Sequence, residues 1–464
     1  MALLGLALIL GAALRSWRLG AADLSADEAA AWAAAAAPDV GAVAARQSAL
    51  DAGKLAFYDL TLHGWIRLFG DGVAAMRALS ALLGVAAIVL AFAAARAVMT
   101  VLGGPRQAEH AVRTGALAAL LVAVNLVLVT ESRTARMYPL VLAMELAQLA
   151  CFVRAQADCL RPVTRAASLA ATALFSGLAI AANFTAALLI AGEVVWLGWA
   201  AMRRRGPARA LHLAAPALAL AAGLALLAPF TGAAGRTAMG ALRAGALAWA
   251  RARPPWWPLQ LMRRASGKAP FLLFAPLTIY AAWRMAREEG GAALAFLLCW
   301  TAVPPILMMA VSYTITPLEE TRYVIASVVA FLVLAAVGLA LIDDARIQII
   351  LIVLVLALSL DHVRRDFRKP QFPQWRAATA IALAEAGPDG RIAVAPGYAV
   401  NVVRYYLPPG ERARADVADE VCGMRQRALV LGGKDLLAPT RLTELTNCFT
   451  LIRRRLRLVE VRTR

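Results

Sequence analysis

The sequence is poor in charged residues. Only 17% of its 464 residues are Asp, Glu, Lys or Arg, whereas 61% are hydrophobic and the mean hydropathy is +0.67. A soluble domain carries about a quarter of its residues as charges. The deficit excludes an ordinary soluble protein and predicts a polytopic α-helical membrane protein.

Acidic residues are scarcer than basic ones. The chain has 29 Asp and Glu against 48 Lys and Arg, which gives a formal net charge of +19. Such a charge can indicate nucleic-acid binding, but here the arginines are scattered between long apolar runs and form no continuous basic stripe. We therefore expect a membrane partner and no nucleic-acid partner.

Cysteine and histidine are also rare, at five and four residues. Cys151 and Cys159 are separated by seven residues with no histidine nearby, and Cys299 lies in an apolar run, so no zinc-site spacing is present. Cys422 and Cys448 each precede a strand-like run, and parallel neighbouring strands would bring them together. This pair is a disulfide candidate, with two separate buried thiols as the alternative.

Long apolar runs dominate the rest of the chain. A transmembrane helix needs about 20 predominantly apolar residues, and on this basis the sequence predicts about eleven transmembrane helices. They lie near residues 2–19, 74–99, 112–130, 138–157, 167–182, 184–201, 211–229, 270–283, 291–311, 324–342 and 347–361.

Basic residues mark one side of the predicted membrane module. The short loops 103–113 and 203–209 are rich in arginine and fall on one side if the spans alternate, so this side is predicted to be cytoplasmic. Residues 20–72, residues 230–270 and the tail after residue 362 then lie on the outer side. The first run lacks a basic start and a small-residue cleavage site, which predicts a retained span.

Two domains follow from this pattern. Residues 1–362 are predicted to form the membrane module, including the outer loop 20–72 with amphipathic helices, and residues 363–464 to form an extracytoplasmic domain. In the tail, residues 374–387 have helical spacing and end at a Gly-Pro pair. Two short buried strands are predicted at 391–396 and 427–433, so the tail is a small α/β domain.

Carboxylates and cations occur in a particular order on the outer side. Asp27 and Glu28 follow the first apolar run, and residues 58–84 contain the pattern Y…H.W..LFG…..R..S…G. The segments ESRTARMYPL (131–140) and ETRYVIASVVAF (320–331) come later. This order resembles membrane glycosyltransferases of the GT-C class, within it the family of protein O-mannosyltransferases, lipid A aminoarabinose transferases and lipopolysaccharide galacturonosyltransferases.

One segment departs from the pattern of that family. Many relatives have a His-Pro-Pro or Lys-Pro turn where this chain reads GKLAFY at residues 53–58. Lys54 is present and the proline is not.

The resemblance implies a GT-C-like fold and a sugar transferase. Members transfer a sugar from a polyprenyl-phosphate carrier to an acceptor on the exported side of the membrane. For this chain the resemblance implies a hexosyl or pentosyl transferase at the outer face of the bacterial cytoplasmic membrane, with a lipid, glycan or protein of the cell envelope as the acceptor. A positioned carboxylate can take the proton of the attacking hydroxyl, and by resemblance Asp27 is the candidate general base. Glu28 is the second catalytic candidate, which would orient Asp27, contact the acceptor or help hold a divalent cation. No metal ligands are assigned.

The leaving group in such a reaction is a lipid phosphate, which needs positive charge. Lys54, Arg136 and Arg322 are the candidate phosphate-binding residues. The remaining substrate-cavity candidates are Tyr58, His63, Arg133, Tyr138, Glu320 and Tyr323.

Each of these residues also has a structural alternative. Lys54 would be a solvated loop lysine, Arg133 and Arg136 a salt-bridge cluster at a helix end, and His63 a hydrogen-bonded structural histidine. Tyr138 and Tyr323 would be interfacial anchors.

Two other functions stay open at this stage. A non-catalytic lipid-binding relative would keep the fold without the reaction. A polytopic transporter would place its ionisable groups near the bilayer midplane, whereas here they cluster at the predicted outer ends of the spans.

Overall fold

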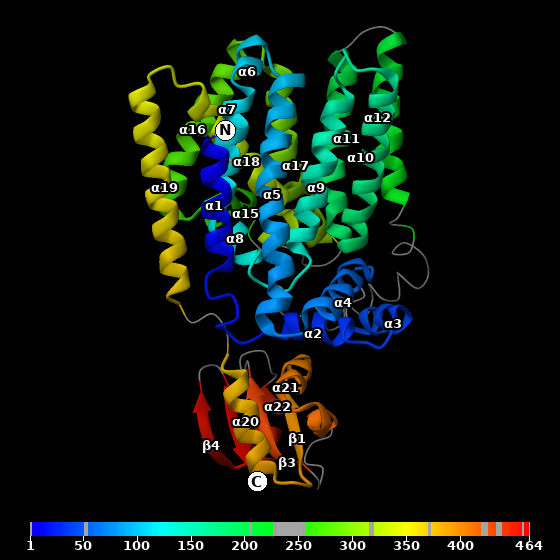
Figure 1. Ribbon diagram of the computed structural model, residues 1–464, viewed down its shortest axis with the longest axis vertical. Coiled ribbons are helices and arrows are strands. Elements are labelled where there is room, and N and C mark those ends of the chain that lie inside the picture. The colour runs from blue at the N-terminus through cyan, green and yellow to red at the C-terminus, as the bar shows by residue number, and fades with distance from the viewer. Residues whose placement is uncertain are drawn as a thin grey trace. The chain divides into compact units, whose positions relative to one another are not determined.

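The computed structural model describes residues 2–50, 54–203, 207–225, 228, 254, 256–314, 320–369, 373–418, 426–432, 439–456 and 459–463. It consists of two compact units (Figure 1). The first unit comprises Met1–Trp17, Asp51–Tyr58 and Ala78–Arg368, and the second comprises Arg18–Leu50, Asp59–Arg77 and Lys369–Arg464. Most of the loop 20–72 therefore groups with the C-terminal tail.

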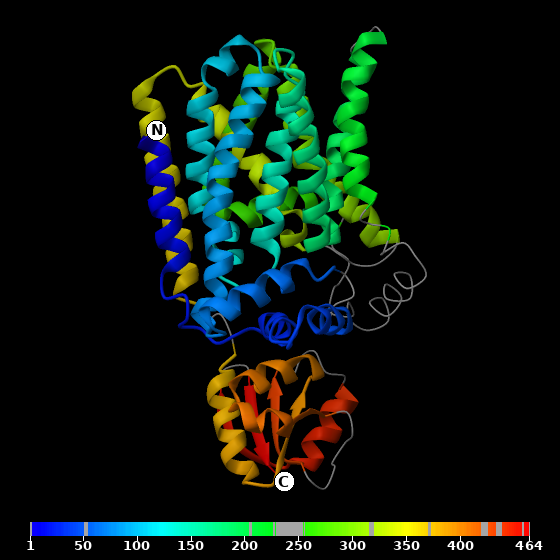
Figure 2. The ribbon, with the colours of Figure 1, turned by 45° about the vertical axis from the view of Figure 1, so that its right-hand side comes forward.

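The first unit is entirely helical in the residues described. Its helices are α1 (Ala2–Ser16), α5 (Val73–Val101, which begins in the second unit), α6 (Pro105–Glu109), α7 (Ala111–Val124), α8 (Leu126–Glu131), α9 (Tyr138–Ala155), α10 (Pro162–Ala182), η1 (Phe184–Ala186), α11 (Ala187–Arg203), α12 (Pro207–Leu224), α15 (Trp257–Ser266), α16 (Lys268–Arg287), α17 (Gly291–Thr314), η4 (Thr321–Val324), α18 (Ile325–Ala340) and α19 (Ala345–Phe367). In Figure 2 the long helices of this unit run roughly parallel to one another.

Eight helices among the described residues are long and apolar enough to cross a membrane. Three shorter apolar helices accompany them, at Ala2–Ser16, Ala111–Val124 and Ala214–Leu224. The chain is a multi-pass helical membrane protein, as its composition predicts. The predicted number of about eleven spans is not confirmed.

The core of the first unit is built around α18. All 16 residues of this helix are buried, which explains why its sequence is apolar on every side. Gly338 faces the backbone of α16 at very short range, because a Cβ at this position would lie 2.2 Å from the Leu277 carbonyl oxygen. A larger residue there would force the two helices apart.

The predicted run 112–130 is broken into α7 and α8 at Asn125. The Asn125 side chain caps α8 by accepting from the Leu128 N–H, and its amide donates to the Ala265 carbonyl at 3.0 Å. The Arg15 guanidinium, 1% exposed, donates to the carbonyls of Val122 and Ala123 in the last turn of α7. Backbone groups freed by a break inside a membrane have no water to bind, and these two side chains satisfy them.

The second unit combines N-terminal helices with a C-terminal α/β fold. The N-terminal helices are α2 (Ala26–Ala35), α3 (Val40–Leu50) and α4 (Phe57–Phe69, which begins in the first unit). The C-terminal elements are α20 (Trp375–Ala386), β1 (Arg391–Ala395), η5 (Gly397–Ala399), α21 (Val400–Tyr406), η6 (Pro409–Arg414), β2 (Ala415–Val417), β3 (Gln426–Gly432), α22 (Pro439–Cys448), β4 (Leu451–Leu456) and β5 (Val459–Thr463).

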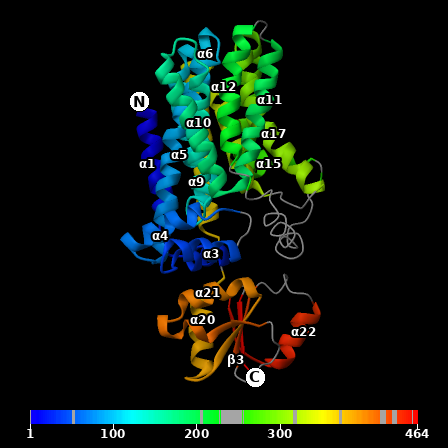
Figure 3. The same cartoon turned by 90° about the vertical axis from the view of Figure 1, so that its right-hand side faces the viewer.

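The five strands in the described part of the chain form one mixed sheet in the order β2-β1-β3-β5-β4. β1 is parallel to β2 and β3, whereas β5 is antiparallel to β3 and β4. Leu445 of α22 and Phe449, which directly follows this helix, pack against Leu429 and Leu431 of β3. Figures 2 and 3 show α20 and α22 on opposite sides of the sheet. The predicted small α/β domain is confirmed.

The cysteines are only partly as predicted. Cys448 is disulfide-bonded, and Cys151, Cys159 and Cys299 are free thiols. Cys422 lies outside the described residues, so its pairing with Cys448 stays a prediction. The expectation of parallel neighbouring strands is wrong, because β5 lies between β3 and β4 in the sheet.

Candidate active site

The predicted site residues divide between the two units. Asp27, Glu28 and His63 belong to the second unit. The other eight belong to the first unit: Lys54, Tyr58, Arg133, Arg136, Tyr138, Glu320, Arg322 and Tyr323.

In the second unit, Asp27 and Glu28 lie in the first turn of α2. Ser25 is the N-cap residue: its hydroxyl accepts from the Glu28 N–H at 3.2 Å, and the Ser25 N–H donates to Glu28 Oε2 at 2.8 Å. This reciprocal capping box fixes where the helix begins. It also turns the Glu28 side chain back toward the helix terminus.

Glu28 forms a buried ion pair with Arg77, at the start of α5. Arg77 Nε and Nη2 donate to the two carboxylate oxygens at 2.7 and 2.9 Å, and the exposed fractions of the two side chains are 2% and 0%. The remaining Arg77 N–H groups donate to the carbonyls of Leu19, Ala22 and Asp23 at 2.9–3.0 Å. All five guanidinium N–H groups are therefore used.

This arrangement favours a positioning role for Glu28. A carboxylate already bound by a bidentate arginine and a backbone N–H is poorly placed to take a proton from a substrate. What the pair does is to hold residues 19–23, the segment that leads into α2, in one conformation.

Asp27 is exposed, unlike Glu28. Its carboxylate lies near Tyr398 of η5: burial is the main cause that raises the pKa of the Tyr398 hydroxyl, and the negative charge of Asp27 raises it further. Adjacent residues on a helix point about 100° apart. The capping box turns Glu28 inward and leaves Asp27 facing outward.

His63 has the geometry of its structural alternative. Its ring is 6% exposed, and Nδ1 lies 2.7 Å from the carbonyl oxygen of Ala35. A carbonyl only accepts, so Nδ1 carries the proton. The bond ties α4 to the end of α2.

In the first unit, two of the three predicted phosphate-binding cations converge on one aromatic ring. The guanidinium carbons of Arg136 and Arg322 lie 5.7 and 5.3 Å from the Tyr138 ring centre. Tyr323 completes the cluster, with its ring centre 6.2 Å from that of Tyr138. Tyr138 is 2% exposed, and its hydroxyl finds no hydrogen-bond partner among the described residues.

Ser80 and Gly84 of α5 support the loop that carries Arg136. The Ser80 hydroxyl donates to the Arg136 carbonyl at 3.2 Å. A Cβ at Gly84 would lie 2.2 Å from the Ser132 hydroxyl oxygen, so only glycine lets α5 approach this loop so closely. The backbone position of Arg136 is thus set from α5.

Lys54 and Tyr58 form a second cation–aromatic pair. Lys54 Nζ lies 5.9 Å from the Tyr58 ring centre, and the exposed fractions of the two residues are 5% and 0%. Lys54 is therefore not a solvated loop lysine. Glu320, the last predicted residue here, immediately precedes η4 and is half-buried.

Arg133 points elsewhere. Its Nη1 donates to the carbonyls of Leu14 and Arg15 at 2.9 and 3.4 Å, and its guanidinium lies 4.4 Å from the Phe367 ring centre. Cations at a helix C-terminus satisfy its last carbonyls. Arg133 thus caps α1, which is a structural role.

Among the residues described, no group of three His, Cys, Asp or Glu side chains is arranged to hold a metal ion. Glu28, the residue considered for a divalent cation, is committed to Arg77.

Sequence reasoning missed Arg77 and the roles of Ser80 and Gly84. The sequence contained signals for the cap of α2 and for all three of these residues. Ser25 and Glu28 are the ends of an S-x-x-E capping signature ahead of an alanine-rich helix. Arg77, Ser80 and Gly84 are the R..S…G of the pattern in residues 58–84.

Comparison with solved structures identifies the fold. ArnT from Cupriavidus metallidurans in the apo state aligns with 99% of this chain and 97% of its own, at 15% identity and a TM-score of 0.64. The same ArnT bound to undecaprenyl phosphate gives 14% identity and a TM-score of 0.62, with the same coverage. The archaeal oligosaccharyltransferase AglB from Archaeoglobus fulgidus, in complex with an inhibitory peptide and a dolichol-phosphate, gives 10% identity and a TM-score of 0.59 over 93% of this chain and 69% of that chain.

No protein-family model and no curated protein sequence matches the chain. The structural likeness runs along nearly the whole length, and ArnT and AglB are both GT-C glycosyltransferases. The chain is a multi-pass membrane protein with the GT-C fold, as the order of its motifs predicts.

Proposed function

We propose that the protein transfers a sugar from a polyprenyl-phosphate-linked donor to an acceptor of the cell envelope. One observation carries the proposal: Arg136 and Arg322, predicted as phosphate-binding residues, both lie over the Tyr138 ring in a chain with the GT-C fold. Two proteins of this fold have been solved with a lipid phosphate, undecaprenyl phosphate in ArnT and dolichol-phosphate in AglB.

The cluster has the chemistry that a departing lipid phosphate needs. Two guanidinium groups supply fixed positive charge and several N–H donors, and arginine binds phosphate oxygens in bidentate fashion. The Tyr138 hydroxyl is a further donor with no partner among the described residues. Charge placed where the phosphate becomes more negative lowers the barrier to its departure. Lys54 is the third proposed contact.

Asp27 is the proposed general base. It is the exposed member of the carboxylate pair, and α2 is fixed at its start by the Ser25 cap and the Glu28–Arg77 ion pair. A hydroxyl of the acceptor would give its proton to Asp27 while its oxygen attacks the anomeric carbon of the sugar. The proposed transfer moves a hexosyl or pentosyl group to a lipid, glycan or protein acceptor.

The phosphate role of Arg322 is tested by direct binding. Arg322→Ala should weaken binding of undecaprenyl phosphate to the purified protein by about 10- to 100-fold, because hydrogen bonds to charged groups contribute about 1.5–3 kcal/mol each. Arg322→Lys should recover part of the affinity, since the charge stays and the bidentate fork is lost. The measurement is a titration by microscale thermophoresis.

Arg203→Ala is the matched control, because Arg203 also lies over an aromatic ring. Its guanidinium carbon is 5.3 Å from the Trp199 ring centre. The affinity of Arg203→Ala for undecaprenyl phosphate should equal that of the wild type. An unchanged affinity in Arg322→Ala would remove the cluster from the proposed phosphate site.

We also propose that the C-terminal α/β domain is extracytoplasmic and that the membrane is the bacterial cytoplasmic membrane. The disulfide at Cys448 supports this, since disulfides persist in oxidising compartments. In protein isolated under acid quench, Cys448 should resist alkylation until a reductant is added, whereas the exposed Cys159 should react without one. Mass spectrometry of the labelled peptides reads this out, and rapid labelling of Cys448 without reductant would contradict the placement.

A non-catalytic lipid-binding protein would share the phosphate site with this proposal. The two functions differ in whether they depend on the Asp27 carboxylate, because only a transferase needs a general base. A transporter would likewise show no transfer of sugar and no dependence on Asp27.

A further inference from the structure

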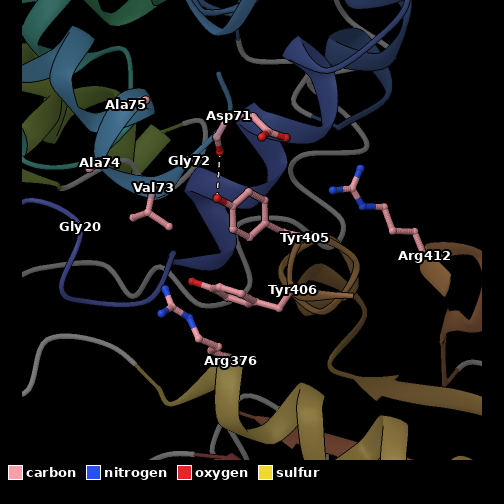
Figure 4. Close-up of a pocket in the computed structure, with 10 residues that line it drawn as sticks. All are labelled: Gly20, Asp71, Gly72, Val73, Ala74, Ala75, Arg376, Tyr405, Tyr406 and Arg412. Carbon is pink, nitrogen blue, oxygen red and sulfur yellow. Dashed lines mark hydrogen bonds between the residues drawn. The ribbon is translucent and has the colours of Figure 1, made fainter. Parts of the chain in front are cut away.

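The second unit contains a pocket that the proposed reaction does not use. Its volume is about 640 Å³, in the range of small-molecule sites. It is lined by Gly20, Asp71, Gly72, Val73, Ala74, Ala75, Arg376, Tyr405, Tyr406 and Arg412 (Figure 4). All ten residues belong to the second unit.

Two tyrosines at the end of α21 form an aromatic wall. Figure 4 shows their rings with Arg376 and Arg412 to either side. The Tyr405 hydroxyl donates to the Asp71 carbonyl at 2.9 Å, and the Tyr406 hydroxyl accepts from the Leu24 N–H at 2.8 Å. Trp32 packs edge-on against Tyr405, with ring centres 5.1 Å apart. The wall is therefore held in place by Trp32 of α2, by Leu24 just before α2 and by Asp71 just before α5.

The two arginines of the pocket differ sharply from Arg77. Arg412 lies 4.8 Å from the Trp32 ring centre, and among the described residues its guanidinium makes no hydrogen bond or ion pair. Arg376 lies 5.4 Å from the Tyr406 ring centre, its side chain is 62% exposed, and its ion pair with Asp23 is long, at 3.7 Å. Where Arg77 uses all five donors inside the protein, these two keep donors for a ligand.

Asp71 adds an acceptor to the same pocket. One carboxylate oxygen accepts from Trp32 Nε1 at 3.1 Å, and the residue is exposed, so lone pairs remain for further donors. The pocket thus offers cationic forks, a carboxylate and aromatic faces. Because the lining contains two arginines and one aspartate, the pocket carries an excess of positive charge.

We propose that this pocket binds an anionic saccharide, that is, a sugar that carries a phosphate or carboxylate group. Arg376 and Arg412 bind the acidic group, Asp71 accepts from sugar hydroxyls, and the faces of Tyr405 and Tyr406 cover the apolar C–H face of the ring. A plain phosphate would use the arginines and leave the tyrosines and Asp71 without contacts, and a neutral sugar would leave the arginines without a partner. The binding needs no transfer reaction, so it stands apart from the proposed function.

Saturation-transfer-difference NMR on the full-length protein in nanodiscs of neutral lipid tests the site. The probes are glucose 1-phosphate, glucuronate, glucose and inorganic phosphate. We expect saturable binding of at least one of the two acidic sugars, and which of them binds identifies the acidic group. Glucose and inorganic phosphate should each bind at least about tenfold more weakly.

Arg412→Ala should weaken binding of the acidic sugar by about tenfold or more, without loss of folding, because the Arg412 guanidinium makes no hydrogen bond among the described residues and its backbone carbonyl, which accepts from the Ala415 N–H, is kept. Asp71→Asn should weaken it less, since an amide oxygen still accepts. Arg454→Ala, an exposed arginine of β4 outside the pocket, is the control and should change nothing. Equal binding of inorganic phosphate, no binding of either acidic sugar, or an unchanged affinity in Arg412→Ala would each overturn the proposal.

Discussion

Asp27→Asn should lower the rate of sugar transfer by roughly 10²–10⁴-fold while leaving the affinity for undecaprenyl phosphate within about twofold of the wild type. The amide keeps the size of the side chain and removes the basic oxygen. The phosphate contacts proposed for Arg136 and Arg322 belong to the other unit and do not involve Asp27. Turnover and binding should therefore separate, with kcat lowered and donor affinity kept.

The experiment requires a reconstituted transfer assay with envelope extract as the source of donor and acceptor. Asp39→Asn is the matched control: it is an exposed carboxylate in the same unit, directly before α3, where it accepts from the Ala42 N–H at 2.8 Å. Asparagine caps a helix as well as aspartate does, so this variant should transfer normally. Near-normal transfer in Asp27→Asn would contradict the assignment and leave Asp27 as a polar residue at a helix start.

Arg77→Ala should destabilise the start of α2 by about 3–5 kcal/mol, because it leaves the buried Glu28 carboxylate without its cation. It also removes the donors that hold the carbonyls of Leu19, Ala22 and Asp23. Amide hydrogen exchange of residues 19–28 should accelerate by roughly two to four orders of magnitude, with peptides of α18 unchanged.

Two further variants make this result specific. Arg46→Ala removes an exposed arginine of the same unit that donates only weakly, at 3.3 Å to the Ala33 carbonyl, and should leave exchange unaltered. Adding Glu28→Gln to Arg77→Ala removes the uncompensated charge and should recover part of the protection. If the double variant were no better protected than Arg77→Ala, the ion pair would not be what holds this segment.

Hydropathy predicted the helical membrane fold well because burial in lipid constrains composition over about 20 residues at a time. It could not show the break at Asn125. That break depends on Arg15, which is more than 100 residues away in sequence, and on the Ala265 carbonyl. A single polar residue in an apolar run does not reveal whether the fold will supply the hydrogen-bond partners that a break in the helix needs.

The site shows the same limit on a finer scale. Asp27 and Glu28 are adjacent and chemically alike, yet Asp27 is exposed and Glu28 is buried. The difference arises from the helix cap at Ser25 and from Arg77, which both bind Glu28. Arg133 and Arg136 are three residues apart, yet one caps α1 and the other lies over Tyr138. Residue type and motif order predicted which segments carry the candidate site. The direction of each side chain depends on tertiary partners that the local sequence does not contain.

The second unit also has a consequence for the timing of assembly. It is built from both ends of the chain, and the Leu24 N–H finds its partner, the Tyr406 hydroxyl, 382 residues later. At a synthesis rate of about 5–20 residues per second, the N-terminal helices wait roughly 20–80 s before that partner exists. During this interval Trp32 lacks Tyr405 and Arg412, its contacts from the C-terminal tail. A ribosome that stops before residue 369 therefore leaves a membrane bundle with an apolar N-terminal segment uncovered, which makes such truncated chains ready targets for quality-control proteases.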